Sequence, residues 1–150
     1  MTRPTLADPS AQAAAETVAR DFAATLQRGG DTMDADEYDR WFADDVLWGS
    51  PYGLTLTGFA PLNSVHQRLM DAVRHAPDPD APAQGAPASV FEVVTAATVA
   101  PGVVVTQIRR AALVEGGFSE LALYVLVERD GGWWLAAAQN TPVRPAVTAD

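Results

Sequence analysis

The spacing of apolar residues predicts helices in the first half of the chain. After Asp8-Pro9, a typical helix start, apolar residues recur at intervals of three and four as far as Leu26, and Gly29-Gly30 is expected to end this helix. A second, short helix is predicted to begin near Asp34. A third helix has Pro61 in its first turn and an apolar stripe that is expected to face the core, formed by Leu62, Val65, Leu69 and Val73.

The second half of the chain has the pattern of strands. A short hairpin at 46–57 is followed by strand-like runs at about 89–99, 103–114 and 119–129, and the last strand covers Gly132 to Pro142. Sequential strands joined by glycine-containing turns predict an antiparallel meander. Helices followed by such a meander indicate an α+β fold, with the helices on one face of the sheet.

The chain has 150 residues, which is typical of one domain spanning 1–150. We expect flexible tails at 1–7 and 145–150. Four prolines lie between residues 77 and 88, and we expect the segment 77–87 to be the most mobile part of the chain after the termini.

The last strand ends its apolar rows with two amides. Strict alternation places Trp133, Leu135, Ala137 and Gln139 on one face and Trp134, Ala136, Ala138 and Asn140 on the other. We interpret the first row as inward, so that Gln139 lies where the packing opens into a space that holds something polar. A hydrogen-bonded core amide is the open alternative.

Two motifs resemble one known family. The first is Gly-Trp-x-Leu-Ala-Ala-x-Gln-Asn-Thr-Pro-Val at 132–143, and the second is Phe-Ala-Asp-Asp-Val-Leu-Trp at 42–48, followed by Gly53, Gly58 and His66. Together they resemble the SnoaL-like domains of the nuclear transport factor two-like superfamily, in the branch named after the SgcJ/EcaC proteins of antibiotic gene clusters. The resemblance implies a cone of three helices on a curved, mainly antiparallel sheet, with a pocket at its wide end.

Composition excludes several partners and chemistries. The net charge is −9, and the ten basic residues are scattered arginines, so neither nucleic acid nor an anionic membrane is an expected partner. The chain has no cysteine, only two histidines, and no nucleotide-binding motif, so we expect no metal and no cofactor. No apolar run is long enough for a membrane helix or typical of a signal peptide, and the cytoplasm is the expected location.

Asp45 and His66 are the candidate catalytic residues. His66 lies on a helix face beside the apolar stripe, and the ordinary pKa of histidine suits proton transfer near neutral pH. Asp45 is expected on the inward side of the second helix, with Tyr38, Trp41 and Phe42. A structural histidine and a turn-forming aspartate are the alternatives. If His66 lines a cavity, its truncation to alanine should weaken ligand binding with little loss of stability.

The candidate ligand-binding residues are aromatic or polar. Arg110 lies on the even-numbered face of the strand from 103, with Val104, Thr106 and Ile108, and could hold a carboxylate or enolate, although a solvated strand end is the commoner case. We expect Gln139, His66, Trp48 and Asp45 to meet at one cavity. The full set of candidate binding residues is Tyr38, Trp41, Trp48, Tyr52, Arg110, Tyr124 and Gln139.

Two functions from different classes remain open. The resemblance implies a protein of natural-product biosynthesis that binds a polyketide-like or enediyne-like, apolar or aromatic, oxygenated small molecule. It could catalyse cofactor-free acid/base chemistry of the isomerase, cyclase or epoxide-opening type. The alternative is a non-catalytic ligand-binding or scaffold protein. We also expect a homodimer formed through the outer face of the sheet, where Trp134 leaves an apolar surface.

Overall fold

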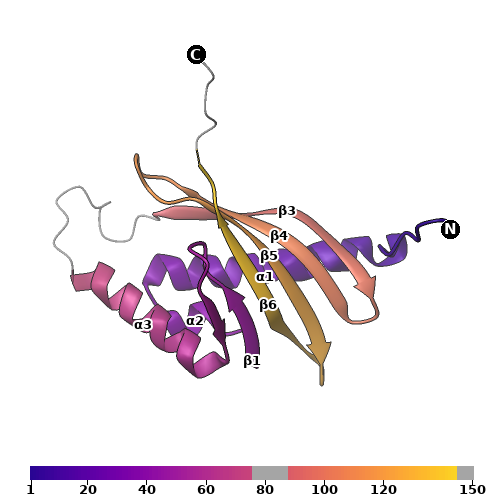
Figure 1. Cartoon of the computed structure of the whole chain (residues 1–150), viewed down its shortest axis with the longest axis horizontal. Coiled ribbons are helices and arrows are strands. Elements are labelled where there is room, and N and C mark those ends of the chain that lie inside the picture. The colour runs from indigo at the N-terminus through magenta and orange to yellow at the C-terminus, as the bar shows by residue number, and fades with distance from the viewer. Residues whose placement is uncertain (76–87, 145–150) are drawn as a thin grey trace, which may run out of the picture.

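The computed structural model describes residues 1–75 and 88–144, which form one α+β domain (Figure 1). A 3-10 turn, η1 (Pro9–Ala11), precedes helices α1 (Gln12–Thr32), α2 (Ala35–Tyr38) and α3 (Phe59–His75). The strands are β1 (Phe42–Gly49), β2 (Thr55–Thr57), β3 (Ser89–Ala100), β4 (Val103–Ala112), β5 (Glu120–Arg129) and β6 (Gly132–Pro142).

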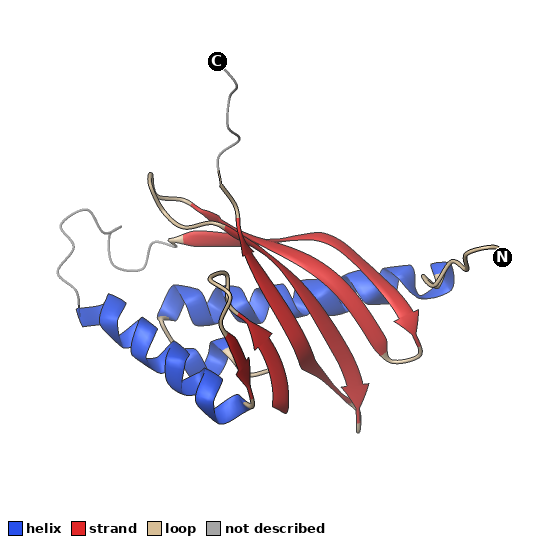
Figure 2. Ribbon diagram, in the orientation of Figure 1, coloured by secondary structure: helices blue, strands red, loops and turns tan. Residues whose placement is uncertain are grey.

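The six strands form one curved sheet in the order β2-β1-β6-β5-β4-β3 (Figure 2). The predicted antiparallel meander is confirmed for β3 to β6. The β1–β2 hairpin joins this sheet through a parallel pairing of β1 with β6. The predicted class, three helices on a mainly antiparallel sheet, is therefore confirmed.

Helix α1 covers the inner face of the meander. Asp8 accepts a hydrogen bond from the backbone nitrogen of Ser10 at 2.9 Å, which caps the start of η1 as its sequence predicted. Ala15, Ala19, Phe22 and Leu26 are each at most 1% exposed and pack against the inner rows of the sheet. The small alanines let the helix approach the strands closely, so this half of the interior is tightly packed.

The prediction that Gly29-Gly30 ends α1 is wrong. The helix continues to Thr32 and ends at Met33, whose backbone is left-handed with φ of 51°. Gly29 has a different role, because a Cβ there would lie 2.4 Å from the backbone nitrogen of Tyr38. Its missing side chain lets α2 cross α1 in close contact.

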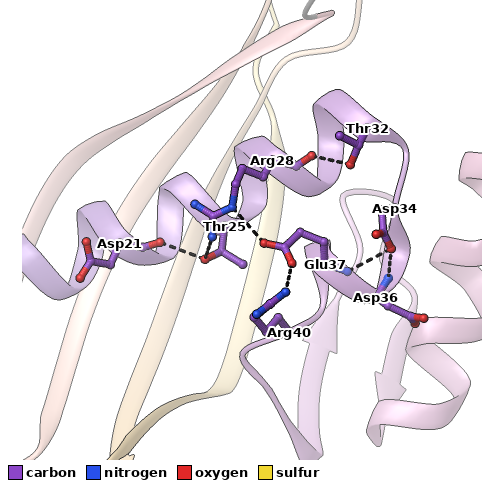
Figure 3. Close-up of polar contacts among 8 residues, drawn as sticks. All are labelled: Asp21, Thr25, Arg28, Thr32, Asp34, Asp36, Glu37 and Arg40. Carbon is purple, nitrogen blue, oxygen red and sulfur yellow. Dashed lines mark hydrogen bonds and ion pairs between the residues drawn. The ribbon is translucent and has the colours of Figure 1, made fainter. Parts of the chain in front are cut away.

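Polar contacts fix this crossing from the outside (Figure 3). The carboxylate of Glu37 on α2 binds Arg28 of α1 at 3.0 Å and also contacts Arg40. Asp34 caps α2 by accepting hydrogen bonds from the backbone nitrogens of Asp36 and Glu37. The short helix α2 is thereby held in one orientation, which positions the two residues at its end, Tyr38 and Asp39.

Strand β6 departs from strict alternation. Val125 pairs with Ala137 and Leu126 pairs with Leu135, so Ala136 is an extra residue in the β5–β6 ladder. This bulge reverses the facing of every later residue in the strand. Leu135, Ala138 and Asn140 are buried, whereas Gln139 is exposed. The predicted inward row is therefore correct at Leu135 and wrong at Ala137 and Gln139.

Helix α3 packs only partly on the interior. Leu62 is 1% exposed, but Leu69 and Val73 are 60% and 59% exposed. The helix lies beside α2, β1 and β2 and does not cover the meander (Figure 1). The prediction that its whole apolar stripe faces the core is therefore wrong beyond the first turn of the stripe.

Residues 77–87, predicted to be mobile, and the predicted tail 145–150 lie outside the described residues. Residues 1–7 are exposed and have no regular structure, and their flexibility remains a prediction. Within 1–75 and 88–144, no helix has the length and apolar character needed to cross a membrane.

Candidate functional site

A cavity of about 680 Å³ lies between α3, the β1–β2 hairpin and the inner face of the sheet. It occupies the region that α3 leaves uncovered. Its walls are mainly apolar and aromatic, and a few polar side chains project from different elements. These polar residues include His66, Arg110, Glu120 and Asn140.

His66 is paired with a buried carboxylate. Its Nδ1 lies 2.6 Å from Oδ1 of Asp39, the residue that follows α2, and Asp39 is 0% exposed. The other oxygen of Asp39 accepts a hydrogen bond from Nδ2 of Asn63 at 3.0 Å. Both carboxylate oxygens thus have a partner, which a buried charge requires.

Three aromatic rings surround the His66 imidazole. The rings of Tyr38 and Trp48 have centroids 5.3 Å from that of His66, each at 80°, and the ring of Phe42 lies at 6.1 Å. Their packing restricts the imidazole to one orientation. Because Asp39 occupies Nδ1, Nε2 is the nitrogen left for proton transfer, and it has no protein partner among the described residues.

Arg110 and Glu120 form a second polar group at adjacent positions of β4 and β5. Nε of Arg110 lies 3.5 Å from Oε1 of Glu120, and the guanidinium carbon lies 5.5 Å from the ring centroid of Phe118. Burial raises the pKa of the Glu120 carboxyl, and the neighbouring Arg110 and His66 side chains offset this only in part. Burial likewise raises the pKa of the Tyr38 phenol. Both Glu120 and Tyr38 line the cavity.

Five predicted residues line this cavity: Tyr38, Trp48, Tyr52, His66 and Arg110. Their roles remain predictions. The structure brings them together because β1, the following loop, α3 and the end of β4 all border the same space.

Trp41 and Tyr124 pack against Phe22 of α1 and are not part of the cavity wall. The ring centroid of Phe22 on α1 is 5.3 Å from that of Trp41 and 5.0 Å from that of Tyr124. Tyr124 is 2% exposed. Its polar tip made it a candidate, but α1 covers this part of the sheet completely.

The expected positions of Asp45 and Gln139 are wrong. The second helix ends at Tyr38 and β1 begins at Phe42, so Asp45 belongs to a strand and is exposed. The pairing of β1 with β6 is irregular between Phe42 and Leu47, and the two aspartates in this stretch, Asp44 and Asp45, are exposed and do not line the cavity. Gln139 lies on the outer face because of the β6 bulge.

Three residues of the site were missed by sequence reasoning. Asp39 is one of several acids around α2, and only the crossing of α2 and α3 distinguishes it from the others. Glu120 has the sequence signature of a solvated strand end. Asn140 could have been found, since it is the second of the two amides at the end of β6. Strict alternation placed it on the outer face, and Gln139 was chosen instead.

Within the part of the chain that the structure describes, no group of three or more histidine, aspartate and glutamate side chains could hold a metal ion. The available chemistry is proton transfer by an oriented imidazole inside an apolar space. Neutral hydrogen-bond donors and one arginine could stabilise negative charge on a ligand oxygen.

No protein-family model matches the sequence, and no curated protein matches it. Solved structures match the fold. A domain of unknown function with a cystatin-like fold from Nostoc punctiforme has a TM-score of 0.69 and 17% identity, covering 88% of this chain and 79% of its own. A nuclear transport factor two-like protein with a cystatin-like fold from Novosphingobium aromaticivorans has a TM-score of 0.61 and 15% identity, covering 91% and 87%.

Aln2 from a Streptomyces species is also similar, with a TM-score of 0.66 and 14% identity, covering 92% of this chain and 94% of its own. At such identities the likeness concerns the fold alone. The fold is therefore nuclear transport factor two-like and cystatin-like, and function has to be argued from the site.

Proposed function

We propose that this protein binds an apolar, oxygenated small molecule in the cavity and catalyses cofactor-free acid/base chemistry on it. The observation that carries the proposal is the 2.6 Å contact between Nδ1 of His66 and the buried carboxylate of Asp39, on the wall of a cavity of about 680 Å³. A carboxylate that accepts from Nδ1–H keeps the neutral imidazole in the tautomer whose Nε2 is a base.

The proposed step is proton abstraction beside a carbonyl group. Nε2 of His66 takes the proton from the carbon, and the electron pair of the C–H bond moves to the carbonyl oxygen to form an enolate. Asp39 stabilises the imidazolium that results, and Tyr38 or Arg110 donates a hydrogen bond to the enolate oxygen. Return of the proton to another carbon gives an isomer, and attack of the enolate on a second carbonyl gives a cyclised product.

The biosynthetic context is a finer part of the proposal. The motifs at 42–48 and 132–143 support membership of the SgcJ/EcaC-type branch, and hence a polyketide-like or enediyne-like ligand. A polyketide synthase gene beside the gene for this protein would support that substrate class. A neighbourhood without any biosynthetic gene would count against it.

A non-catalytic ligand-binding role is the second candidate. Asp39 is bonded by both Asn63 and His66, and the imidazole is packed between aromatic rings. A network of this kind can serve only to hold α2 against α3. Catalysis and simple binding therefore need to be separated by experiment.

Hydrogen–deuterium exchange at the α-carbon of 2-tetralone, followed by NMR in D2O, separates the two candidates. Binding of the same ketone is measured by quenching of tryptophan fluorescence. A catalyst accelerates the exchange above the buffer rate, and His66→Asn should remove about a hundredfold of this acceleration. The asparagine amide can still donate to Asp39, so the variant loses the base and keeps the pair.

His75→Asn is the matched control, because His75 is exposed at the end of α3 and outside the cavity lining. It should leave the exchange rate unchanged. Binding of 2-tetralone without any acceleration by the wild-type protein would favour the non-catalytic role. No binding would contradict the proposed ligand class.

We also propose a homodimer formed through the outer face of the sheet. Leu47, Leu123 and Trp134 are 48%, 43% and 43% exposed on β1, β5 and β6, which leaves an unusually apolar surface. Light scattering should give twice the mass of one chain, and Trp134→Glu should shift the equilibrium to monomers. A wild-type monomer at micromolar concentration would contradict this proposal.

A further inference from the structure

Asn140 is the most deeply buried polar residue on the cavity wall that the proposed proton transfer does not use. It lies near the end of β6, is 3% exposed, and lines the cavity. Its Nδ2 donates a hydrogen bond to the backbone carbonyl of Gly49 at 2.9 Å. Its Oδ1 is buried and has no hydrogen-bond partner among the described residues.

The orientation of this amide follows from its partner. A backbone carbonyl can only accept a hydrogen bond, so the nitrogen of Asn140 must face Gly49 and the oxygen must face the other way. Gly49 is itself fixed, because it pairs with Gln139 in the parallel ladder between β1 and β6. The position of Oδ1 is therefore determined by the backbone of two strands.

A buried acceptor without a donor costs about 1–3 kcal/mol, and buried polar atoms in folded proteins are nearly always paired. The missing donor at a cavity wall can be supplied by a bound molecule. An acceptor cannot bind a carbonyl, ether or carboxylate oxygen, because none of these groups donates a hydrogen bond.

We propose that Oδ1 of Asn140 is a recognition site for a hydroxyl group on the ligand, and that the cavity selects a phenol or alcohol over the matching ether. This inference rests on the proposed function, since it specifies what the same cavity binds. It makes Asn140 a specificity-determining residue.

The proposed hydroxyl site belongs to the same cavity as His66. Gly49 follows Trp48 in β1, and the ring of Trp48 lies 5.3 Å from that of His66. A ligand in this cavity can therefore contact Asn140 and His66 together, since both residues line it.

Binding of 2-naphthol and of 2-methoxynaphthalene tests the inference. The two probes share an apolar body that is small compared with the cavity, and they differ in the hydroxyl hydrogen. Fluorescence titration should show that the wild-type protein binds 2-naphthol about five- to tenfold more tightly, as expected for one hydrogen bond to a buried acceptor. Asn140→Leu, which has a similar shape and no acceptor, should abolish this preference and leave binding of the methoxy compound intact.

Gln139→Leu is the matched control, because it removes the neighbouring amide from the outer face of the same strand. It should keep the preference for 2-naphthol. Asn140→Ala provides a second variant with the same expected loss, should the leucine variant fold poorly.

Equal affinity of the two probes for the wild-type protein would overturn the inference and leave the proposed cavity function standing. A preference for 2-naphthol that survives in both Asn140 variants would also overturn it. If the wild-type protein bound neither probe, the proposed ligand class would fail, and the hydroxyl site would fail with it.

Discussion

The two long helices carry similar apolar stripes but have different roles in the interior. Helix α1 buries Ala15, Ala19, Phe22 and Leu26 completely against the meander. Helix α3 buries only Leu62 and leaves Leu69 60% exposed beside the cavity. The first helix therefore stabilises the fold, and the second forms the wall of a binding site.

The difference comes from what each helix can reach. Alanines on α1 allow close contact with the sheet, whereas α3 is separated from the meander by the β1–β2 hairpin and α2. The cavity between α3 and the sheet is lined with apolar side chains. A bound ligand would remove these side chains from water. The end of the molecule that is poorly packed as a free protein is thus the end suited to binding.

The comparison is tested most directly by one substitution in each helix. Leu26→Ala removes a fully buried side chain from α1 and should reduce the free energy of unfolding by about 2–5 kcal/mol. Leu69→Ala on α3 should change it by less than about 1 kcal/mol, because that side chain is already 60% exposed. Urea unfolding of both variants measures the difference, and equal losses would contradict the proposed division of roles.

Two glycines allow a similar comparison, between the crossing of α1 with α2 and the end of strand β1 beside the cavity. Gly29→Ala places a Cβ 2.4 Å from the backbone of Tyr38, which cannot move without separating α2 from α1, so we expect a loss of about 3 kcal/mol. Gly49→Ala meets the side-chain oxygen of exposed Gln139 at 2.0 Å, and that flexible side chain can rotate away. Thermal unfolding should show a large loss only for Gly29→Ala.

The buried pair at the cavity should also affect stability. His66→Ala leaves the fully buried Asp39 with one donor where it had two, and we expect a loss of about 2 kcal/mol. This revises the expectation that truncating His66 has little effect on the fold. His66→Asn, which keeps a donor, should recover part of the loss in the same urea titration. Wild-type stability of the alanine variant would show that Asp39 is not held as a buried charge.

The smallest expected effect concerns Glu120 and depends on pH. Because burial raises its folded-state pKa above the ordinary value of 4.5, the stabilising contribution of this group is present below that pH and is lost as the pH rises through the folded-state pKa. The melting temperature of Glu120→Gln, relative to the wild type, should therefore rise as the pH increases above 4.5. Glu92→Gln, on an exposed residue of β3, should show no such trend. If the difference in melting temperature between Glu120→Gln and the wild type did not change with pH, the raised pKa of Glu120 would be contradicted.

Much of the fold could be predicted from the sequence, because it depends on the spacing of apolar residues within single helices and strands. The row Val104, Thr106, Ile108 and Arg110 on β4 alternates as predicted, and each of the first three is at most 1% exposed. The buried stripe of α1 follows the predicted three-and-four spacing. Both patterns depend on the repeat of a single strand or helix, which the sequence states directly.

The polar residues of the cavity could be predicted from the sequence only in part. His66, Trp48 and Arg110 were found because each residue type is unusual at its place in a local pattern. Asp39 and Glu120 were not, since an acid at a helix end or strand end is common and is usually solvated. Their burial arises from the crossing of α2 with α3 and from the pairing of β4 with β5.

By itself the sequence determined the α+β class, the meander and the buried faces of α1 and β4, because these follow from the repeat of apolar residues along short segments. The tertiary structure alone decided which amide of β6 faces the cavity. One extra residue in the ladder with β5 turns Asn140 inward and Gln139 outward, and that bulge depends on a partner strand rather than on any local signal. It also decided that α3 borders an open space, since a helix pattern shows which side is apolar but not whether anything lies against it.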